Sequence, residues 1–230
     1  MINLGIGIMA IPEREENVNK IIEDLSTDNV KVFYDFEHTT PYETSKRAFT
    51  TLAKQEDITH ILVIQDDVKL CENFLDIVYK AIEANPNVIL NLYNPRFKEY
   101  DINTSPYFVF DAVTMFSGQA IIMPRDIAIE CFDWCDKHPD RRKIFLHADD
   151  SSIKIYANAR RIKLVGTKVS LVQHLKIKRA DGRIPITHQS RLFLDDFENK
   201  DKIDWSRMDI IIWQQNQKIF KTSLYKNCKI

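Results

Sequence analysis

Glycine is scarce in this sequence, with only 5 among 230 residues. Neither a GxGxxG pattern nor a GxxxxGK[ST] pattern occurs, so the glycine-rich loops that cradle phosphates in dinucleotide-binding and P-loop proteins are absent. This disfavours nicotinamide-dependent oxidoreductases and P-loop enzymes. Any phosphate group that the protein binds must therefore be held by cationic side chains and not by a backbone cradle.

Cysteine and long apolar runs are also in short supply. The 4 cysteines are scattered, and the closest pair, Cys131 and Cys135, matches neither a CxxC motif nor a zinc-ribbon spacing. No apolar run approaches the ~20 residues that a membrane helix needs, and no basic region precedes the apolar N-terminal stretch. We therefore expect a cytoplasmic protein with reduced thiols and no membrane span. With 44% hydrophobic residues the chain can build one good core.

The first 92 residues alternate between apolar runs and amphipathic segments. The runs predict strands at residues 3–11, 30–36, 60–64 and 88–92, and the spacing between them predicts helices ending near Leu25, over 40–54 and over 75–82. Strands that alternate with helices are typical of a parallel α/β sheet. The strand at 60–64 is apolar throughout, as expected of a central strand covered on both faces.

Shorter and weaker strands follow in the second half of the chain. We expect a strand pair at 112–116 and 120–123, helices from Pro124 to Cys135 and over 149–159, and a last strand at 165–171. The sheet would then be mixed but mostly parallel. The prediction is one α/β domain over residues 1–190, with a C-terminal extension over 191–230 that packs on it through its aromatic residues Trp205, Trp213, Phe220 and Tyr225.

An acidic pair stands where the most apolar strand ends, in the sequence Gln65-Asp66-Asp67. Ligands bind beyond the carboxyl ends of strands in open α/β sheets. Two adjacent carboxylates repel each other unless a cation or hydrogen bonds compensate them, so a divalent metal with oxygen ligands is one interpretation. The other is a solvent-facing acidic turn that caps the next helix.

Two further clusters are candidates for chemistry. Asp149 and Asp150 open an amphipathic segment, where one of them is either a general base or a helix N-cap. Adjacent helical residues point about 100° apart, so both are not expected to face one substrate. His174 follows the last predicted strand and is either a structural histidine or a partner of a carboxylate-bound metal.

The acidic pair Asp66-Asp67, the pair Asp149-Asp150 and His174, in this order along the chain, resemble the functional clusters of the GT-A glycosyltransferases. These enzymes transfer a sugar from a nucleotide-sugar to an acceptor. The last segment is similar to the PSLxQH ending of branching N-acetylglucosaminyltransferases and lipopolysaccharide transferases, although Lys168-Val169 replaces its proline. The match covers residues 3–175 and is carried by Ala10-Ile-Pro12-Glu-Arg14, Ser45-Lys-Arg47-Ala48, Ile61-Leu-Val-Ile-Gln65-Asp66-Asp67-Val68, Ser117-Gly118-Gln119-Ala120-Ile-Ile-Met-Pro124-Arg125 and Ser170-Leu-Val-Gln-His174.

The resemblance implies a metal centre and a base. Gln65-Asp66-Asp67 occupies the position of the family's DxD motif, with glutamine in place of the first acid. Asp67 would ligate Mn²⁺ or Mg²⁺ on the donor diphosphate, Asp66 would contact ribose or metal, and His174 would complete the metal's ligands. Asp149 or Asp150 would deprotonate the acceptor hydroxyl for displacement with inversion.

The resemblance also implies where the nucleotide of the donor, most simply a UDP-sugar, would bind. Arg14, in the loop that also includes Ala10 and Pro12, and Arg47, on the helix before the metal strand, would face the nucleotide. Asp35, at the end of the second strand, would contact the base. The implied architecture is a single GT-A-like, Rossmann-like domain.

The net charge of −1 hides an uneven distribution. Residues 141–190 carry twelve Lys and Arg against three Asp, a net +9, which leaves −10 for the rest of the chain. Such a segment either attracts a polyanionic acceptor or is a solvated helix face that also holds the donor diphosphate. Hydroxymethylated bacteriophage DNA and a phosphorylated lipopolysaccharide core both fit as acceptors. The competing functions are a non-catalytic nucleotide- or nucleic-acid-binding module and a nucleotide-sugar hydrolase.

Overall fold

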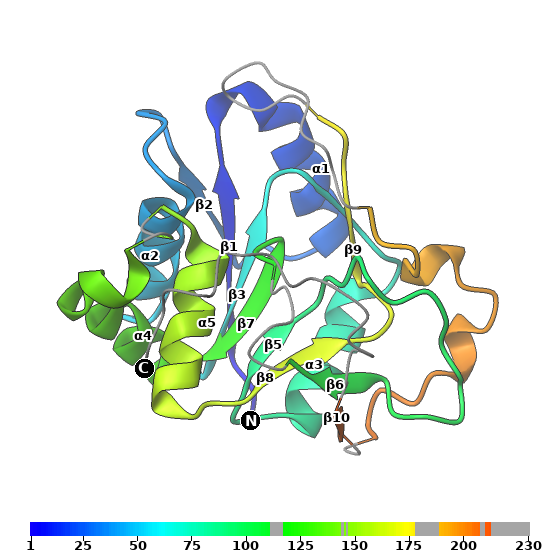
Figure 1. Ribbon diagram of the computed structural model, residues 1–230. Helices are drawn as coiled ribbons and strands as arrows, with labels where there is room; N and C mark the ends of the chain where they lie inside the picture. The colour runs from blue at the N-terminus through cyan, green and yellow to red at the C-terminus, as the bar shows by residue number, and fades with distance from the viewer. Residues whose placement is uncertain (111–116, 144, 146, 178–188, 208–209, 213–230) are drawn as a thin grey trace.

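The protein is built around one twisted sheet with helices on both faces (Figure 1). In the computed structural model, the described part of the chain comprises residues 1–110, 117–143, 145, 147–177, 189–207 and 210–212. Within these residues no helix is both long and apolar enough to cross a membrane.

The main sheet has eight strands in the order β10-β6-β8-β5-β7-β3-β1-β2. Five of them run in one direction, and β7, β6 and β10 run in the other, so the sheet is mixed and mostly parallel as the sequence predicts. The strands are β1 Leu4–Ala10, β2 Val30–Tyr34, β3 His60–Gln65, β5 Ile89–Asn91, β6 Tyr107–Val109, β7 Ala120–Pro124, β8 Leu164–Thr167 and β10 Ile210–Ile212.

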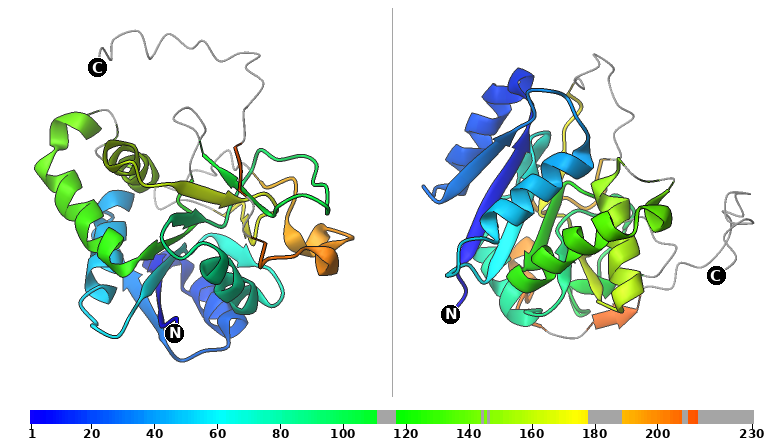
Figure 2. Two further views of the ribbon diagram at one scale, coloured as in Figure 1. Left: turned by 90° about the horizontal axis from the view of Figure 1, so that it is seen from below. Right: turned by 90° about the vertical axis from the view of Figure 1, so that its left-hand side faces the viewer.

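Helices cover the two faces and enclose two apolar cores. One core lies under α1 and α3, and the other lies under α2, α4 and α5, which gather on the opposite face (Figure 2). Both strands β1 and β3 are apolar because they contribute side chains to both cores. The helices are α1 Glu15–Leu25, α2 Pro41–Leu52, α3 Phe74–Ala84, α4 Arg125–Lys137 and α5 Asp149–Arg160.

Local signals set several of the helix ends. Thr40 caps α2 by accepting a hydrogen bond from the backbone N–H of Glu43 at 3.2 Å, and Pro41 occupies the first helical position. Ser26 and Arg161 adopt left-handed conformations after α1 and α5. Each predicted helix is therefore present, with ends shifted by a few residues at most.

The strand predicted over residues 165–171 is wrong in its extent. Only β8 belongs to the main sheet, and the chain then leaves that sheet to form β9 Val172–His174, which pairs antiparallel with β4 Val68–Leu70. The crossing backbone is held by other partners, since Lys168 N–H donates to the Pro106 carbonyl at 2.9 Å and Ser170 N–H donates to the Leu192 carbonyl at 2.7 Å. The predicted strand at 112–116 lies outside the described residues.

The C-terminal segment 189–207 packs on the main sheet. Trp205 is buried, and its carbonyl accepts a hydrogen bond from the Tyr107 hydroxyl at 2.6 Å. Phe193, Leu194 and Ile203 join the same core. Trp213, Phe220 and Tyr225 lie outside the described residues, and the division of the chain at residue 190 stays a prediction.

Candidate functional site

The acidic pair lies at the carboxyl ends of β1 and β3, toward which both arrows point in Figure 1. The backbone N–H of Ile11 donates to Oδ2 of Asp66 at 2.8 Å. The guanidinium of Arg14, in the short helix η1 Pro12–Arg14, inserts between the two carboxylates. Its Nη1 lies 2.5 Å from Oδ1 of Asp66 and 3.1 Å from Oδ2 of Asp67.

His174 reaches the same pair from the small second sheet. Val68 pairs with His174 across β4 and β9, and the backbone N–H of Leu175 donates to the Asp67 carbonyl at 2.7 Å. This pairing brings Nε2 of His174 to 3.3 Å from Oδ2 of Asp67. The structure thus brings together three residues that the resemblance assigned to one centre.

Burial acts on both carboxyls of the pair, but their neighbours differ. Burial raises the pKa of Asp66 to about 6, against the opposing effect of the Arg14 charge. Burial also acts to raise the pKa of Asp67, but the hydrogen bond and charge of His174, together with Arg14, outweigh it and hold that pKa below its ordinary value. Asp67 therefore carries the firmer negative charge.

Two buried polar atoms at this pair have no hydrogen-bond partner in the part of the chain that the structure describes. They are Oδ1 of Asp67 and the hydroxyl of Tyr93, whose ring packs edge-on against the His174 ring at a centroid distance of 6.2 Å. Buried polar atoms are normally satisfied, so an open oxygen here suits a ligand. Among the described residues, no three His, Cys, Asp or Glu side chains form a metal-binding group. One carboxylate and one imidazole nevertheless fit a cation that takes its remaining ligands from phosphate and water.

A second carboxylate faces the end of β3 from the start of α5. Asp149 is buried at 4% exposure, and its carboxylate lies over the backbone of Gly118. A Cβ built on Gly118 would lie 3.0 Å from Oδ2 of Asp149 and 3.0 Å from Nε2 of Gln65. Burial and the charge of Asp150 raise the pKa of Asp149 to about 7, and the charge of Asp67 adds to the shift.

Amide and hydroxyl side chains line the strand ends between the two carboxylate clusters. Asn91 Nδ2 donates to the Ser117 carbonyl at 2.7 Å, and the Ser117 hydroxyl donates to Oε1 of Gln119 at 2.5 Å. Gln119 Nε2 in turn donates to Oε1 of Gln65 at 3.4 Å. We did not expect this network from the sequence, although Asn91 and Gln65 both stand at predicted strand ends.

Comparison with known proteins gives little. No protein-family model matches the chain, and no curated protein matches it. Among solved structures, the fold is similar to that of mannose-1-phosphate geranyltransferase from Thermus thermophilus. The TM-score is 0.45 at 10% sequence identity, over 72% of this chain and 74% of that one.

The other residues expected to bind nucleotide lie along the ends of β1 and β2. The backbone N–H of Asp35 donates to the Ala10 carbonyl at 2.7 Å, and the Asp35 carboxylate accepts the backbone N–H of Thr39 at 3.0 Å. Arg47 is exposed and donates to the Tyr34 carbonyl at 2.5 Å. Pro12 begins η1. These residues share an edge with Arg14, but Arg47 is engaged with β2 and not with the acidic pair.

Asp150 differs from its neighbour in surroundings. Its Oδ1 accepts the backbone N–H of Ser151 at 2.5 Å, and it is less buried than Asp149. Burial raises its pKa, while the hydrogen bonds to Ser151 and the charge of Lys154 oppose the rise. Of the two carboxylates, only that of Asp149 is placed against Gly118 and Gln65.

The basic side chains that the structure describes within 141–190 are not gathered on one surface. Arg142 is buried, donates to the Cys135 carbonyl at 3.0 Å and stacks over the Tyr42 ring at 4.1 Å. Arg160 forms an ion pair with Glu130 at 2.5 Å near the end of α5.

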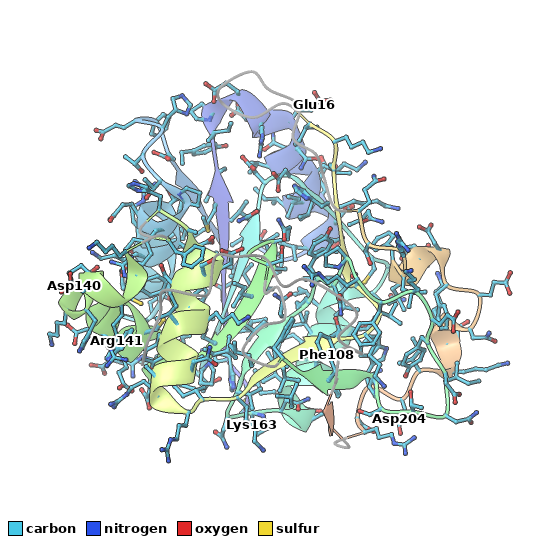
Figure 3. The ribbon with its side chains drawn as sticks, in the orientation of Figure 1. Glu16, Phe108, Asp140, Arg141, Lys163 and Asp204 are labelled. Atoms are coloured by element: carbon cyan, nitrogen blue, oxygen red, sulfur yellow. The ribbon has the colours of Figure 1, made fainter. Side chains whose placement is uncertain are left out.

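Lys168 and Lys163 lie in other surroundings. Lys168 is buried and donates to the Thr104 hydroxyl at 3.1 Å. Figure 3 places Lys163 at the edge opposite Glu16, and Glu16 stands beside the carboxyl end of β1. Lys178, Arg179 and Arg183 lie outside the described residues.

Proposed function

We propose that this chain is a glycosyltransferase that moves a sugar from a nucleotide-sugar, most simply a UDP-sugar, to an acceptor hydroxyl. One observation carries the proposal: the buried carboxylate of Asp149 faces the end of β3 across Gly118. The acidic pair stands directly after the same strand, in contact with Arg14 and His174. A general base and a cluster that would hold the donor diphosphate therefore lie at one edge of the sheet. Sugar transfer needs both, the base for the acceptor hydroxyl and the cluster for the leaving diphosphate.

The donor would bind along the ends of β1 and β2. Arg14 and Arg47 supply the positive charge for a diphosphate, which this chain cannot hold with a glycine-rich loop. Ala10 and Pro12 form the wall beside them, and Asp35 stands where a nucleobase would reach the end of β2. Asp66 anchors this loop through the Ile11 N–H.

Asp67 and His174 are the residues that would hold Mn²⁺ or Mg²⁺ with the donor. Oδ1 of Asp67 has no hydrogen-bond partner among the residues that the structure describes, and the imidazole lies beside Oδ2 of the same carboxylate. The bound cation would supply charge neutralisation for the departing diphosphate. The Tyr93 ring packs edge-on against the imidazole.

Asp149 would act as the general base. Its carboxylate accepts the proton of the acceptor hydroxyl as that oxygen bonds to the anomeric carbon, while the bond from this carbon to the diphosphate oxygen breaks. The electron pair leaves with the nucleoside diphosphate, for which Arg14 and Arg47 supply positive charge, and the anomeric configuration inverts. A pKa near 7 suits this role, because a base is most effective when its pKa lies near the working pH.

The acceptor is proposed to be a polyanion, either DNA that carries hydroxymethylated pyrimidines or a phosphorylated glycan. Only a few basic residues of the segment 141–190 support a polyanionic acceptor. Lys176 is exposed two residues after His174, and Arg141 and Lys143 are exposed in the segment that leads to Asp149.

The decisive experiment is a donor screen with Mn²⁺ and the two acceptor classes, with sugar transfer detected by mass spectrometry. Asp149→Asn should bind donor and lose transfer, and Asp150→Asn is the matched control that should retain most of it. Asp67→Asn should lose the effect of Mn²⁺ on donor binding. Failure of every nucleotide-sugar to bind would refute the proposal, and donor binding without transfer to any acceptor would favour a non-catalytic module.

A further inference from the structure

Arg14 occupies a position that a small divalent cation would compete for. Its side chain is 12% exposed, and a single nitrogen contacts one oxygen of Asp66 and one of Asp67. The backbone N–H of Ile11 donates a hydrogen bond to the second oxygen of Asp66. The guanidinium therefore compensates part of the charge of the acidic pair.

The remaining ligands for a divalent cation are few while Arg14 stays in place. His174 lies beside Oδ2 of Asp67, which Arg14 also contacts. Of the four carboxylate oxygens of the pair, Oδ1 of Asp67 has no hydrogen-bond partner among the described residues. A divalent cation at this carboxylate would also be repelled by the adjacent positive charge. Binding of the cation therefore requires Arg14 to move away from the pair.

A diphosphate provides an alternative partner for the guanidinium. Arginine forms two parallel hydrogen bonds with phosphate oxygens, and this geometry matches them better than a single nitrogen shared between two carboxylates. Arg14 lies in η1, at the end of β1, where the donor is proposed to bind. Moving from carboxylates to diphosphate would thus open Asp67 to the cation as the donor arrives.

We propose that Arg14 is a resident counter-cation of Asp66 and Asp67, that it competes with the divalent cation, and that its transfer to the donor diphosphate couples cation binding to donor binding. The coupling rests on the proposed function, whereas the competition between Arg14 and the cation does not. The cation alone should accordingly bind weakly to the wild-type protein.

The test measures binding of Mn²⁺ alone, with no nucleotide present, by the loss of the free-ion signal in electron paramagnetic resonance. Arg14→Gln should bind Mn²⁺ about tenfold or more tightly than the wild type, because it lacks the competing charge. Arg14→Lys should bind less tightly than Arg14→Gln. Arg160→Gln is the control for loss of one positive charge, since Arg160 pairs with Glu130 away from the site.

A second measurement repeats the titration with UDP. After the Mn²⁺ bound by UDP in a protein-free titration is subtracted, the wild type should gain Mn²⁺ affinity when UDP is added, and Arg14→Gln should gain much less. Equal or weaker Mn²⁺ binding by folded Arg14→Gln would overturn the proposal, as would the absence of Mn²⁺ binding by both proteins. Failure of the proposed function would be seen separately, as a wild-type protein that binds no nucleotide-sugar while the Mn²⁺ titrations still differ.

Discussion

Replacing Asp149 with Asn should make the protein more stable at neutral and alkaline pH while removing transfer. The carboxyl is buried, and its pKa rises from 3.8 to about 7 on folding. At low pH the group is neutral in both the folded and the unfolded chain and costs nothing. As the pH rises from the unfolded to the folded pKa, the unfolded chain releases the proton first, so stability falls.

The magnitude follows from the size of that shift. Ionised Asp149 costs the folded state at most about 4 kcal/mol at pH 8 for the pKa change that burial produces. Because Asp149 and Asp150 titrate as a pair, we expect a gain of about 2–4 kcal/mol for Asp149→Asn at pH 8. The midpoint of thermal unfolding should rise by roughly 5–10 °C. At pH 5 the gain should shrink to about half or less.

Urea unfolding followed by tryptophan fluorescence at pH 5 and pH 8 measures both values. Asp136→Asn gives a control of opposite sign. Hydrogen bonds from Lys46 and Tyr42 outweigh the effect of burial and lower the pKa of Asp136, so its removal should reduce stability at pH 8. A folded Asp149→Asn protein that is no more stable than the wild type at pH 8 would refute the assigned environment of Asp149.

Three other predictions concern the same site and the core below it. Gly118→Ala places a Cβ 3.0 Å from Oδ2 of Asp149 and should lower kcat by about tenfold by displacing the base; an unchanged kcat would contradict its position. The transfer rate of the wild type should fall by about tenfold for each pH unit below about 7, as Asp149 becomes protonated, and a flat profile down to pH 5 would exclude it as the base. Gly166→Ala places a Cβ 2.5 Å from the Phe108 ring and 2.7 Å from that of Phe110. It should lower the free energy of unfolding, measured with urea, by about 1–3 kcal/mol. An unchanged unfolding midpoint would show that the two rings can move aside.

Local sequence was sufficient for most elements of the first half. The runs at 3–11, 30–36 and 60–64 became β1, β2 and β3. In β1 and β3 the run is apolar throughout because both faces of these strands are covered, whereas β2 lies at the edge of the sheet and is only partly buried. Most of the three-residue strands escaped prediction, whereas β5 lies within the strand expected at 88–92. β4, β6, β9 and β10 have three residues each, too few for a period to be recognised, and their pairing depends on partners far along the chain.

Candidate site residues were found by the same local rule. Asp66, Asp67 and His174 each end or follow an apolar strand, and Asp149 begins an amphipathic helix. Their places at the ends of secondary-structure elements could therefore be predicted. Their contacts could not, because a side-chain pair separated by about 50 residues is set by the order of strands in the sheet.

The sequence by itself therefore determined an α/β sheet and the chain positions at which polar groups emerge from it, because apolar periodicity is a local property. Only the tertiary structure decided which of these groups meet. Insertion of β7 between β3 and β5 brings Gly118 under Asp149 and beside Gln65. Closure of the loop after β1 places Arg14 between the two carboxylates, and this contact depends on distant parts of the chain packing against one another.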